Sequence, residues 1–394
     1  MEFVISQDVL KEELGYVQGI VERKSTIPVL SNILIESIGE NAIRIVGTDL
    51  DVTIRCEAEA EIKTPGSMCI QARKLFDIAR LLPNSDVHFK SEADNWVRMT
   101  CEGSKKYRLA GVSREQFPEI PDFKSAPLAL DSEIFCNFIL NTSFAITNEQ
   151  SRFTLSGAKF VIENGTARMV TTDAHRLAFI ETQIPTLDDA AMDALIPKKA
   201  LTELVRISKH SGGDVRFGED ANHIYFEVEG HLLITRKLSG TFPNYEMVMP
   251  KDNDKKVTFG LDEMKRAVAR VALMADERTR SIRFTIREGE IEVSAQSSEE
   301  GEAKEVLMAD YDGEEVQIGF NSQYLQEFLN NISAVQAGVE DVEKETDGDK
   351  VKVRESASDA RIRFEFKDGN AQTQMCLDGD SPYDYKYVVM PLRI

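Results

Sequence analysis

The sequence lacks the features that mark membrane, secreted or metal-dependent proteins. Within its 394 residues, no apolar run approaches the roughly 18 residues of a membrane-spanning helix. The N-terminal stretch has no basic region followed by an apolar one, so we expect no secretory signal. The five cysteines are scattered and include no CxxC pair, which argues against a disulfide framework or a structural zinc site. We therefore expect a cytoplasmic protein with reduced thiols and without a metal or another cofactor.

Motifs of the common enzyme classes are also missing. The chain contains no G-x-S-x-G, H-E-x-x-H, P-loop or G-x-G-x-x-G sequence. The segment TTDAHRLA (171–178) brings an acid, a histidine and an arginine together, but an acid–base site needs further groups that converge on them. The alternative is a turn after a strand whose polar side chains are satisfied locally. We favour the turn and expect no catalytic residues.

Basic residues are scarcer than acidic ones. Lys and Arg total 47 and Asp and Glu total 67, which gives a formal net charge of −20. This balance disfavours a general nucleic-acid binder, whose usual footprint is a basic domain. A basic strip inside an acidic body is still compatible with the composition.

What the sequence does contain is a repeat with a period of roughly 125 residues, a normal length for a domain. The segments IRIVGTDLD (43–51) and ARMVTTDAH (167–175) both carry Thr-Asp after a strand-like run. Phe-Pro recurs in REQFPEIP (114–121) and SGTFPNYEMVMP (239–250), and YVVMP near the C-terminus resembles the end of the latter. Three copies of one unit would explain why these similar segments recur.

Helices recur in phase with these segments. Residues 70–82, 196–208 and 320–332 carry apolar side chains at helical spacing, and an earlier amphipathic stretch precedes each of them. Short alternating segments between the helices are typical of antiparallel strands. We therefore predict an α+β protein of three tandem domains, each with two helices on an antiparallel sheet. The predicted boundaries are 1–125, 126–253 and 254–394.

One segment breaks the repeat. Residues 333–360 are polar and free of aromatic side chains. This composition predicts an extended hairpin or a mobile insertion rather than core.

Basic side chains recur on the predicted helices, opposite their apolar faces. They are Arg73, Lys74, Arg80, Lys198, Lys199, Arg206, Lys209, Lys265, Arg266 and Arg270. A charge run is usually a solvated face, but recurrence at corresponding positions favours one shared basic surface. Contact with DNA would then consist of sparse phosphate interactions without base reading.

The C-terminus, YKYVVMPLRI (385–394), is unusually apolar. Chain ends are normally polar, so this end is either packed as a final strand or lines a groove. The sequence leaves both alternatives open.

The three copies, TTDAHRLA and the terminal YVVMPLRI together resemble the beta subunit of bacterial DNA polymerase III, the beta sliding clamp family. The resemblance covers essentially the whole chain except the insertion. It implies three DNA-clamp domains per chain and a head-to-tail homodimer closed into a ring around duplex DNA. Such a clamp is a processivity factor that tethers the replicative polymerase and other DNA-processing proteins. The alternative is a cytosolic peptide-binding scaffold that does not encircle DNA.

The resemblance also implies site residues. A pocket for short hydrophobic motifs of the polymerase III alpha subunit, the clamp loader delta subunit, other polymerases and repair proteins would comprise Leu155, Thr172, His175, Arg176, Leu177, Pro243, Val248, Asn321, Tyr324, Val388, Val389, Met390, Pro391, Leu392 and Arg393. The implied DNA contacts are Lys24, Arg73, Gln150, Arg152, Lys198 and Lys199. At the dimer interface, Tyr107 and Leu109 would pack against Leu273 and Met274 of the other chain. Ala174 and Met247 depart from the glycine and arginine common in the family.

Overall fold

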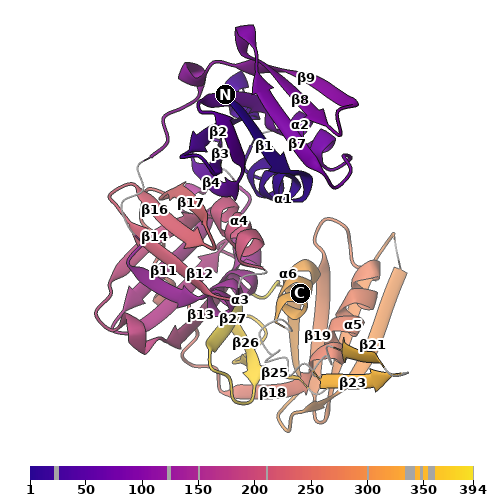
Figure 1. Ribbon diagram of the computed structural model, residues 1–394. Helices are drawn as coiled ribbons and strands as arrows, with labels where there is room; N and C mark the ends of the chain where they lie inside the picture. Colours follow the sequence, from indigo (N-terminus) through magenta and orange to yellow (C-terminus); the bar gives the residue numbers. More distant parts are fainter. Residues whose placement is uncertain are drawn as a thin grey trace. The chain divides into compact units, whose positions relative to one another are not determined.

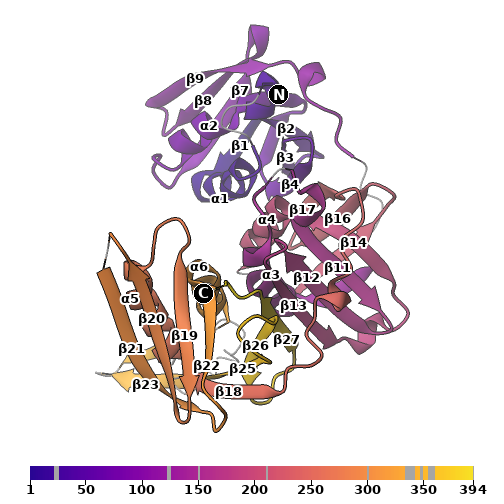
Figure 2. The same ribbon diagram turned by 180° about the vertical axis from the view of Figure 1, so that it is seen from behind.

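The computed structural model describes residues 1–21, 26–121, 126–149, 151–209, 212–299, 301–332 and 360–393, and the backbone of 342–346 and 349–353. The chain divides into two compact units. One consists of Met1–Cys136 and Ile196–Lys237, and the other of Asn137–Leu195 and Leu238–Ile394. Their elements are labelled in Figure 1 and seen from behind in Figure 2.

The first unit is built on a 13-stranded antiparallel sheet. In spatial order its strands are β10 (Leu128–Asp131), β15 (Asp214–Glu219), β16 (His223–Val228), β17 (His231–Arg236), β4 (Val52–Glu59), β3 (Ala42–Thr48), β2 (Asn32–Ile38), β6 (Ser67–Gln71), β9 (Lys105–Val112), β8 (Trp96–Cys101), β7 (Asp86–Ser91), β1 (Glu2–Ser6) and β5 (Glu61–Thr64). Because β17 pairs with β4, the sheet is continuous from the second copy of the repeat into the first.

The second unit is built on a 12-stranded sheet. Its order is β14 (Met192–Pro197), β11 (Gly157–Glu163), β12 (Thr166–Thr172), β13 (Arg176–Gln183), β27 (Asp384–Val389), β26 (Thr373–Asp378), β25 (Arg361–Phe366), β18 (Lys255–Gly260), β21 (Gly301–Asp310), β20 (Glu290–Ser297), β19 (Ser281–Arg287) and β22 (Val316–Asn321). Here β13 of the second copy pairs with β27 of the third. Strand pairing therefore joins successive copies in both units.

The described residues form six α-helices, two in each copy, as the repeat predicts. They are α1 (Gln7–Gln18), α2 (Ala72–Ala79), α3 (Ser132–Thr142), α4 (Lys198–Ser208), α5 (Leu261–Val271) and α6 (Ser322–Asn331). Figures 1 and 2 show α5 and α6 side by side against the strands of the third copy. The matching leucines Leu75, Leu201 and Leu325 are all buried. The α+β prediction with two helices per copy is confirmed, and none of the described helices is long and apolar enough to cross a membrane.

Within the predicted insertion 333–360, strands β23 (Val342–Thr346) and β24 (Asp349–Val353) pair antiparallel. This pairing agrees with the hairpin alternative for that part of the segment. Residues 333–341, 347–348 and 354–359 lie outside the described residues.

Helix α1 packs very closely on β3, and Gly47 permits this approach. A Cβ atom at Gly47 would lie 2.4 Å from Cγ1 of Val17 and 3.1 Å from Cγ2 of Val21. The matching residue of the second copy, Thr171, is fully buried and donates its hydroxyl to the carbonyl of Thr142 at 2.5 Å. At the same point of the repeat, the first copy thus has no side chain, and the second has a buried threonine bonded to its helix.

We expect Gly47→Ala to lower the free energy of unfolding by about 1–3 kcal/mol, as overpacking of a filled core does. Gly212→Ala is the matched control, since its Cβ would meet nothing within 4 Å, and its effect should stay within about 0.5 kcal/mol. Urea unfolding followed by circular dichroism measures both. Equal midpoints for the two variants would contradict the close packing of α1 on β3.

Candidate functional site

The segment TTDAHRLA forms a tight turn between β12 and β13. Asp173 Oδ1 accepts the backbone N–H groups of His175 at 3.0 Å and Arg176 at 3.1 Å. The hydroxyl of Thr172 accepts the N–H of Ala174 at 3.1 Å. Ala174 has a φ of 74°, a left-handed conformation that glycine adopts more readily. Asp173 is therefore engaged in holding the turn.

The first copy has the same turn at GTDLD. Asp49 Oδ1 accepts the N–H groups of Asp51 at 3.0 Å and Val52 at 2.7 Å, and Thr48 Oγ1 accepts that of Leu50. Leu50, like Ala174, has a positive φ, here 79°. Thr-Asp thus serves the scaffold in both copies, whereas a histidine and an arginine follow only in the second.

Arg176 is a buried cation, with 7% of its surface exposed. Its Nε donates to Asp173 Oδ2 at 3.0 Å, its Nη2 donates to the carbonyl of Phe144 at 2.7 Å, and its Nη1 lies 2.5 Å from Glu327 Oε2. Its Cζ is 4.3 Å from the ring centroid of Tyr324.

Burial would by itself lower the pKa of the Arg176 guanidinium, but interactions with Tyr387 and Glu327 outweigh it and the pKa is raised. The group therefore stays charged. It connects the start of β13 to helix α6, and it has the contacts of a positioning residue rather than of an acid or a base.

Beside this turn lies a cavity of about 160 Å³. It is lined by Leu155, Thr172, Ala174, His175, Arg176, Leu177, Pro243, Tyr245, Val248, Val388 and Met390. Leu155, Leu177 and Val388 also belong to a buried apolar cluster. The volume is below the roughly 300 Å³ of a small-molecule site, so the cavity suits one or two apolar side chains of a peptide. The N–H of Met390 donates to the carbonyl of His175 at 3.0 Å, which ties the terminal segment to the turn.

The cavity brings together nine of the residues predicted for the pocket, all those in its lining except Ala174 and Tyr245. Tyr245 was missed, although it lies two residues after Pro243 in the Phe-Pro segment. Six predicted residues lie outside the lining. Asn321 caps α6 by accepting the N–H of Gln323, and Tyr324 packs on Arg176.

The other four belong to the C-terminal segment. Val389 is fully buried in β27. Leu392 donates its N–H to the carbonyl of Gly319 at 2.8 Å. Pro391 is half-buried and Arg393 is exposed. The segment therefore passes from β27, along the cavity, to Gly319 within β22.

The basic residues predicted to contact DNA differ in their surroundings. Arg73 is exposed on α2, 3.9 Å from Asp77, and Lys198 begins α4. Lys24 and Gln150 lie outside the described residues.

The other two predicted contacts are engaged within the chain. Arg152 donates to the carbonyl of Asp173 at 2.8 Å and pairs with Glu149. Lys199 donates to the carbonyl of Ile20 at 2.7 Å and pairs with Asp49. Both basic groups therefore have roles in the protein that sequence could not show.

Besides the end strands of the two sheets, the described residues include two strands, β9 and β21, with an open edge over part of their length. Residues 105–110 of β9 pair only with β8, and residues 301–308 of β21 pair only with β20. Tyr107 and Leu109 lie half-buried on β9. Leu273, in the 3₁₀ turn Ala272–Met274 that follows α5, is 73% exposed. An exposed strand edge is a template for pairing with another chain.

Comparison with known proteins agrees with the three-copy architecture. Family models of the DNA polymerase III beta subunit match the chain in three parts, the N-terminal domain at residues 1–121, the central domain at 129–244 and the C-terminal domain at 246–344. The beta sliding clamp of Caulobacter vibrioides is 32% identical over 400 residues, covering 100% of both chains. That of Pseudomonas putida is 31% identical, again over 100% of both.

Solved structures are similar as well. A sliding clamp (DNA polymerase III subunit beta) from Pseudomonas aeruginosa bound to griselimycin has a TM-score of 0.86 at 28% identity, and a DNA polymerase sliding clamp from Caulobacter crescentus has 0.86 at 30%. Each match covers 100% of both chains. The chain therefore belongs to the family of DNA polymerase III beta subunits, and its function is that of a DNA sliding clamp.

Proposed function

We propose that two copies of this chain close head to tail into a ring around duplex DNA. The open edges of β9 and β21 support this, because closure would pair edges that are otherwise exposed. Tyr107 and Leu109 of one copy would pack against Leu273 and Met274 of the other. The alternative of a scaffold that does not encircle DNA finds no support in the family comparisons.

The ring is retained on DNA by its topology rather than by tight binding. A net charge of −20 repels stray DNA from the exterior, and a few basic groups on the helices tolerate the duplex inside. Among the proposed phosphate contacts, Arg152 and Lys199 also bind backbone carbonyls of the protein, so they would have to share their charge between the protein and the duplex. Each phosphate that a basic side chain neutralises strengthens DNA binding and makes it more salt-dependent. A ring with few such contacts therefore binds DNA weakly enough to slide along it. Lys24 and Gln150 complete the proposed set.

The cavity beside TTDAHRLA is the proposed peptide-binding pocket. The observation that carries this is its apolar floor of Leu155, Leu177 and Val388, with His175 and Met390 at its rim. Short hydrophobic motifs of the polymerase III alpha subunit, the clamp loader delta subunit, other polymerases and repair proteins would compete for it. His175 and Arg176 then supply shape and hydrogen bonds, and the chain works in the cytoplasm as a processivity factor without a catalytic site of its own.

Fluorescence anisotropy of a labelled QLxLF-type peptide tests the pocket, with a scrambled peptide as control. The full chain is expected to bind saturably, and a chain ending at Val389 to bind at least about tenfold more weakly, a loss of 1.4 kcal/mol or more. The truncation removes Met390 from the rim but keeps strand β27 whole. Equal binding by both chains would place the site elsewhere, and no binding by either would refute the pocket while leaving the family membership intact.

A further inference from the structure

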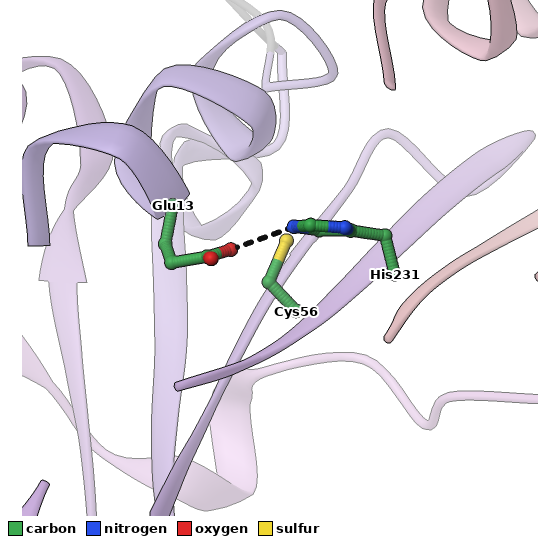
Figure 3. Close-up of side chains that lie close together, drawn as sticks. All are labelled: Glu13, Cys56 and His231. Carbon is green, nitrogen blue, oxygen red and sulfur yellow. Dashed lines mark hydrogen bonds and ion pairs between the residues drawn. The ribbon is translucent and has the colours of Figure 1, made fainter. Parts of the chain in front are cut away.

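Three side chains with metal-binding atoms meet in the first unit, whereas the cavity belongs to the second. They are Glu13 of α1, Cys56 of β4 and His231 of β17, and their ligand atoms all lie within 4.8 Å of one another. Figure 3 shows the carboxylate, the thiol and the imidazole pointing toward one point from three elements. In the described part of the chain, this is the one cluster of three or more such groups.

The strand ladder explains why two of them meet. Cys56 and His231 are direct partners in the antiparallel pairing of β4 with β17, so their side chains project from the same face of the sheet. Helix α1 lies over this face, and its buried stripe consists of Leu10, Leu14 and Val17. Glu13 is buried beside that stripe, with 9% of its surface exposed. Glutamate is seldom buried without a partner of opposite charge, and here His231 is that partner, 2.9 Å away.

The histidine is held as metal-binding histidines are. Its Nδ1 lies 3.3 Å from the carbonyl of Val228, and its Nε2 lies 2.9 Å from Glu13 Oε2. A hydrogen bond from one ring nitrogen to a backbone carbonyl fixes the ring and directs the other nitrogen toward a metal ion. The ring also packs on Tyr16 at 4.6 Å between centroids. The His231 and Glu13 side chains keep 14% and 12% of their surface exposed, which leaves an entry path from solvent.

We propose that Glu13, Cys56 and His231 form a binding site for a divalent transition-metal ion, with Zn²⁺ as the best fit. One sulfur, one nitrogen and one oxygen ligand suit Zn²⁺ and do not suit Mg²⁺ or Ca²⁺, which take oxygen ligands. Metal–ligand distances of roughly 2.0–2.3 Å place the ligand atoms about 3.3–3.8 Å apart. The widest pair of ligand atoms, at up to 4.8 Å, therefore has to approach by about an ångström, whereas Nε2 of His231 and Oε2 of Glu13, 2.9 Å apart, have to separate slightly. Small side-chain rotations achieve both.

Water supplies the fourth ligand. The thiol gives up its proton to solvent on binding, so that a thiolate and a carboxylate balance the charge of the ion. The ion would fasten α1 to the β4–β17 junction, where the first and second copies of the repeat share a sheet. The site is independent of the ring and of the peptide pocket. It also runs against the expectation of no metal, which rested on spacing, because residues so far apart in the chain form no recognisable motif.

A Co²⁺ titration of the full-length, chelator-treated protein tests the site. One equivalent per chain is expected to bind and to give a thiolate-to-metal charge-transfer band with the d–d bands of a tetrahedral site. Cys56→Ser should abolish the charge-transfer band and weaken binding by at least the roughly 10- to 100-fold that loss of an outer-shell partner costs. Cys136→Ser is the matched control, since Cys136 is the least buried of the five cysteines, and should leave the spectrum unchanged.

A wild-type spectrum without a thiolate band, or a band that survives Cys56→Ser, would overturn the proposal. The wild-type spectrum decides the question even if a variant folds poorly. Zn²⁺ should also raise the thermal unfolding midpoint of the wild type but not that of His231→Gln, because an ion that binds only the folded state stabilises it. His223→Gln, a substitution on the neighbouring strand β16, should retain the wild-type response.

Discussion

Arg176→Ala is expected to lower the free energy of unfolding by about 3–5 kcal/mol, the usual effect of removing one partner of a buried ion pair. The substitution leaves Asp173 and Glu327 facing each other without the cation between them. It also removes the donor to the carbonyl of Phe144 and the cation over the ring of Tyr324. Because Arg176 lines the cavity, peptide affinity should fall together with stability.

Chemical denaturation of the full chain measures this effect, and Arg363→Ala is its control. Arg363 also lies in a strand of the second unit and pairs with Glu365 and Asp378, but its side chain is 38% exposed. Exposed ion pairs contribute about 0–1 kcal/mol, so the control should change little. Combining Arg176→Ala with Glu327→Gln should cost less than the sum of the two single effects, since the second change removes the orphaned charge. A loss below 1 kcal/mol for Arg176→Ala would refute the role given to this ion pair.

Most of the fold prediction rested on the repeat. Leu75, Leu201 and Leu325 are each 1% exposed or less, because an apolar stripe at helical spacing has to face a core in every copy. The sequence did not predict that β17 pairs with β4 and β13 with β27. Strand partners far apart in the chain leave no local pattern, and only side-chain complementarity selects them.

For the C-terminal segment the sequence left two alternatives, a packed final strand and the lining of a groove, and each describes some of its residues. Val389 is fully buried as part of the central strand β27, while its neighbours Val388 and Met390 line the cavity. Alternation along a strand sends successive side chains to opposite faces, so one short apolar run can serve the core and a surface. The sequence could not assign the residues, because their chemistry is the same on both faces.

Charged residues were the hardest to place. A sequence does not show whether a lysine has an ion-pair partner within the chain. Lys199 has one, Asp49, in another copy of the repeat. Glu13 carries no signal of burial in the sequence, yet it is buried next to His231. Tertiary packing determines which partner a charged residue has, and the local sequence does not show it. Such partners are concentrated at functional sites and at junctions between copies of the repeat.

Leu273→Glu combined with Met274→Glu is expected to open the proposed ring. Leu273 is an apolar side chain left 73% exposed. Burying a carboxylate in its place would require a cation or several hydrogen-bond donors, whereas Tyr107 offers a single hydroxyl and Leu109 none. A head-to-tail ring of two chains contains the same interface twice, so one pair of substitutions weakens both. We expect the dimer dissociation constant to rise at least about a hundredfold, which sedimentation equilibrium measures.

Met247→Glu is the matched control, because Met247 is 80% exposed and lies outside the proposed interface, and it should leave the dimer intact. Retention on closed circular DNA then separates the ring from a peptide-binding scaffold. A ring that has been loaded should stay on a closed circle and leave once the circle is cut, and the double variant should not stay at all. A wild-type chain that is monomeric, or one that leaves closed and cut circles equally fast, would refute the ring, since topology holds a clamp on DNA only while both interfaces are shut.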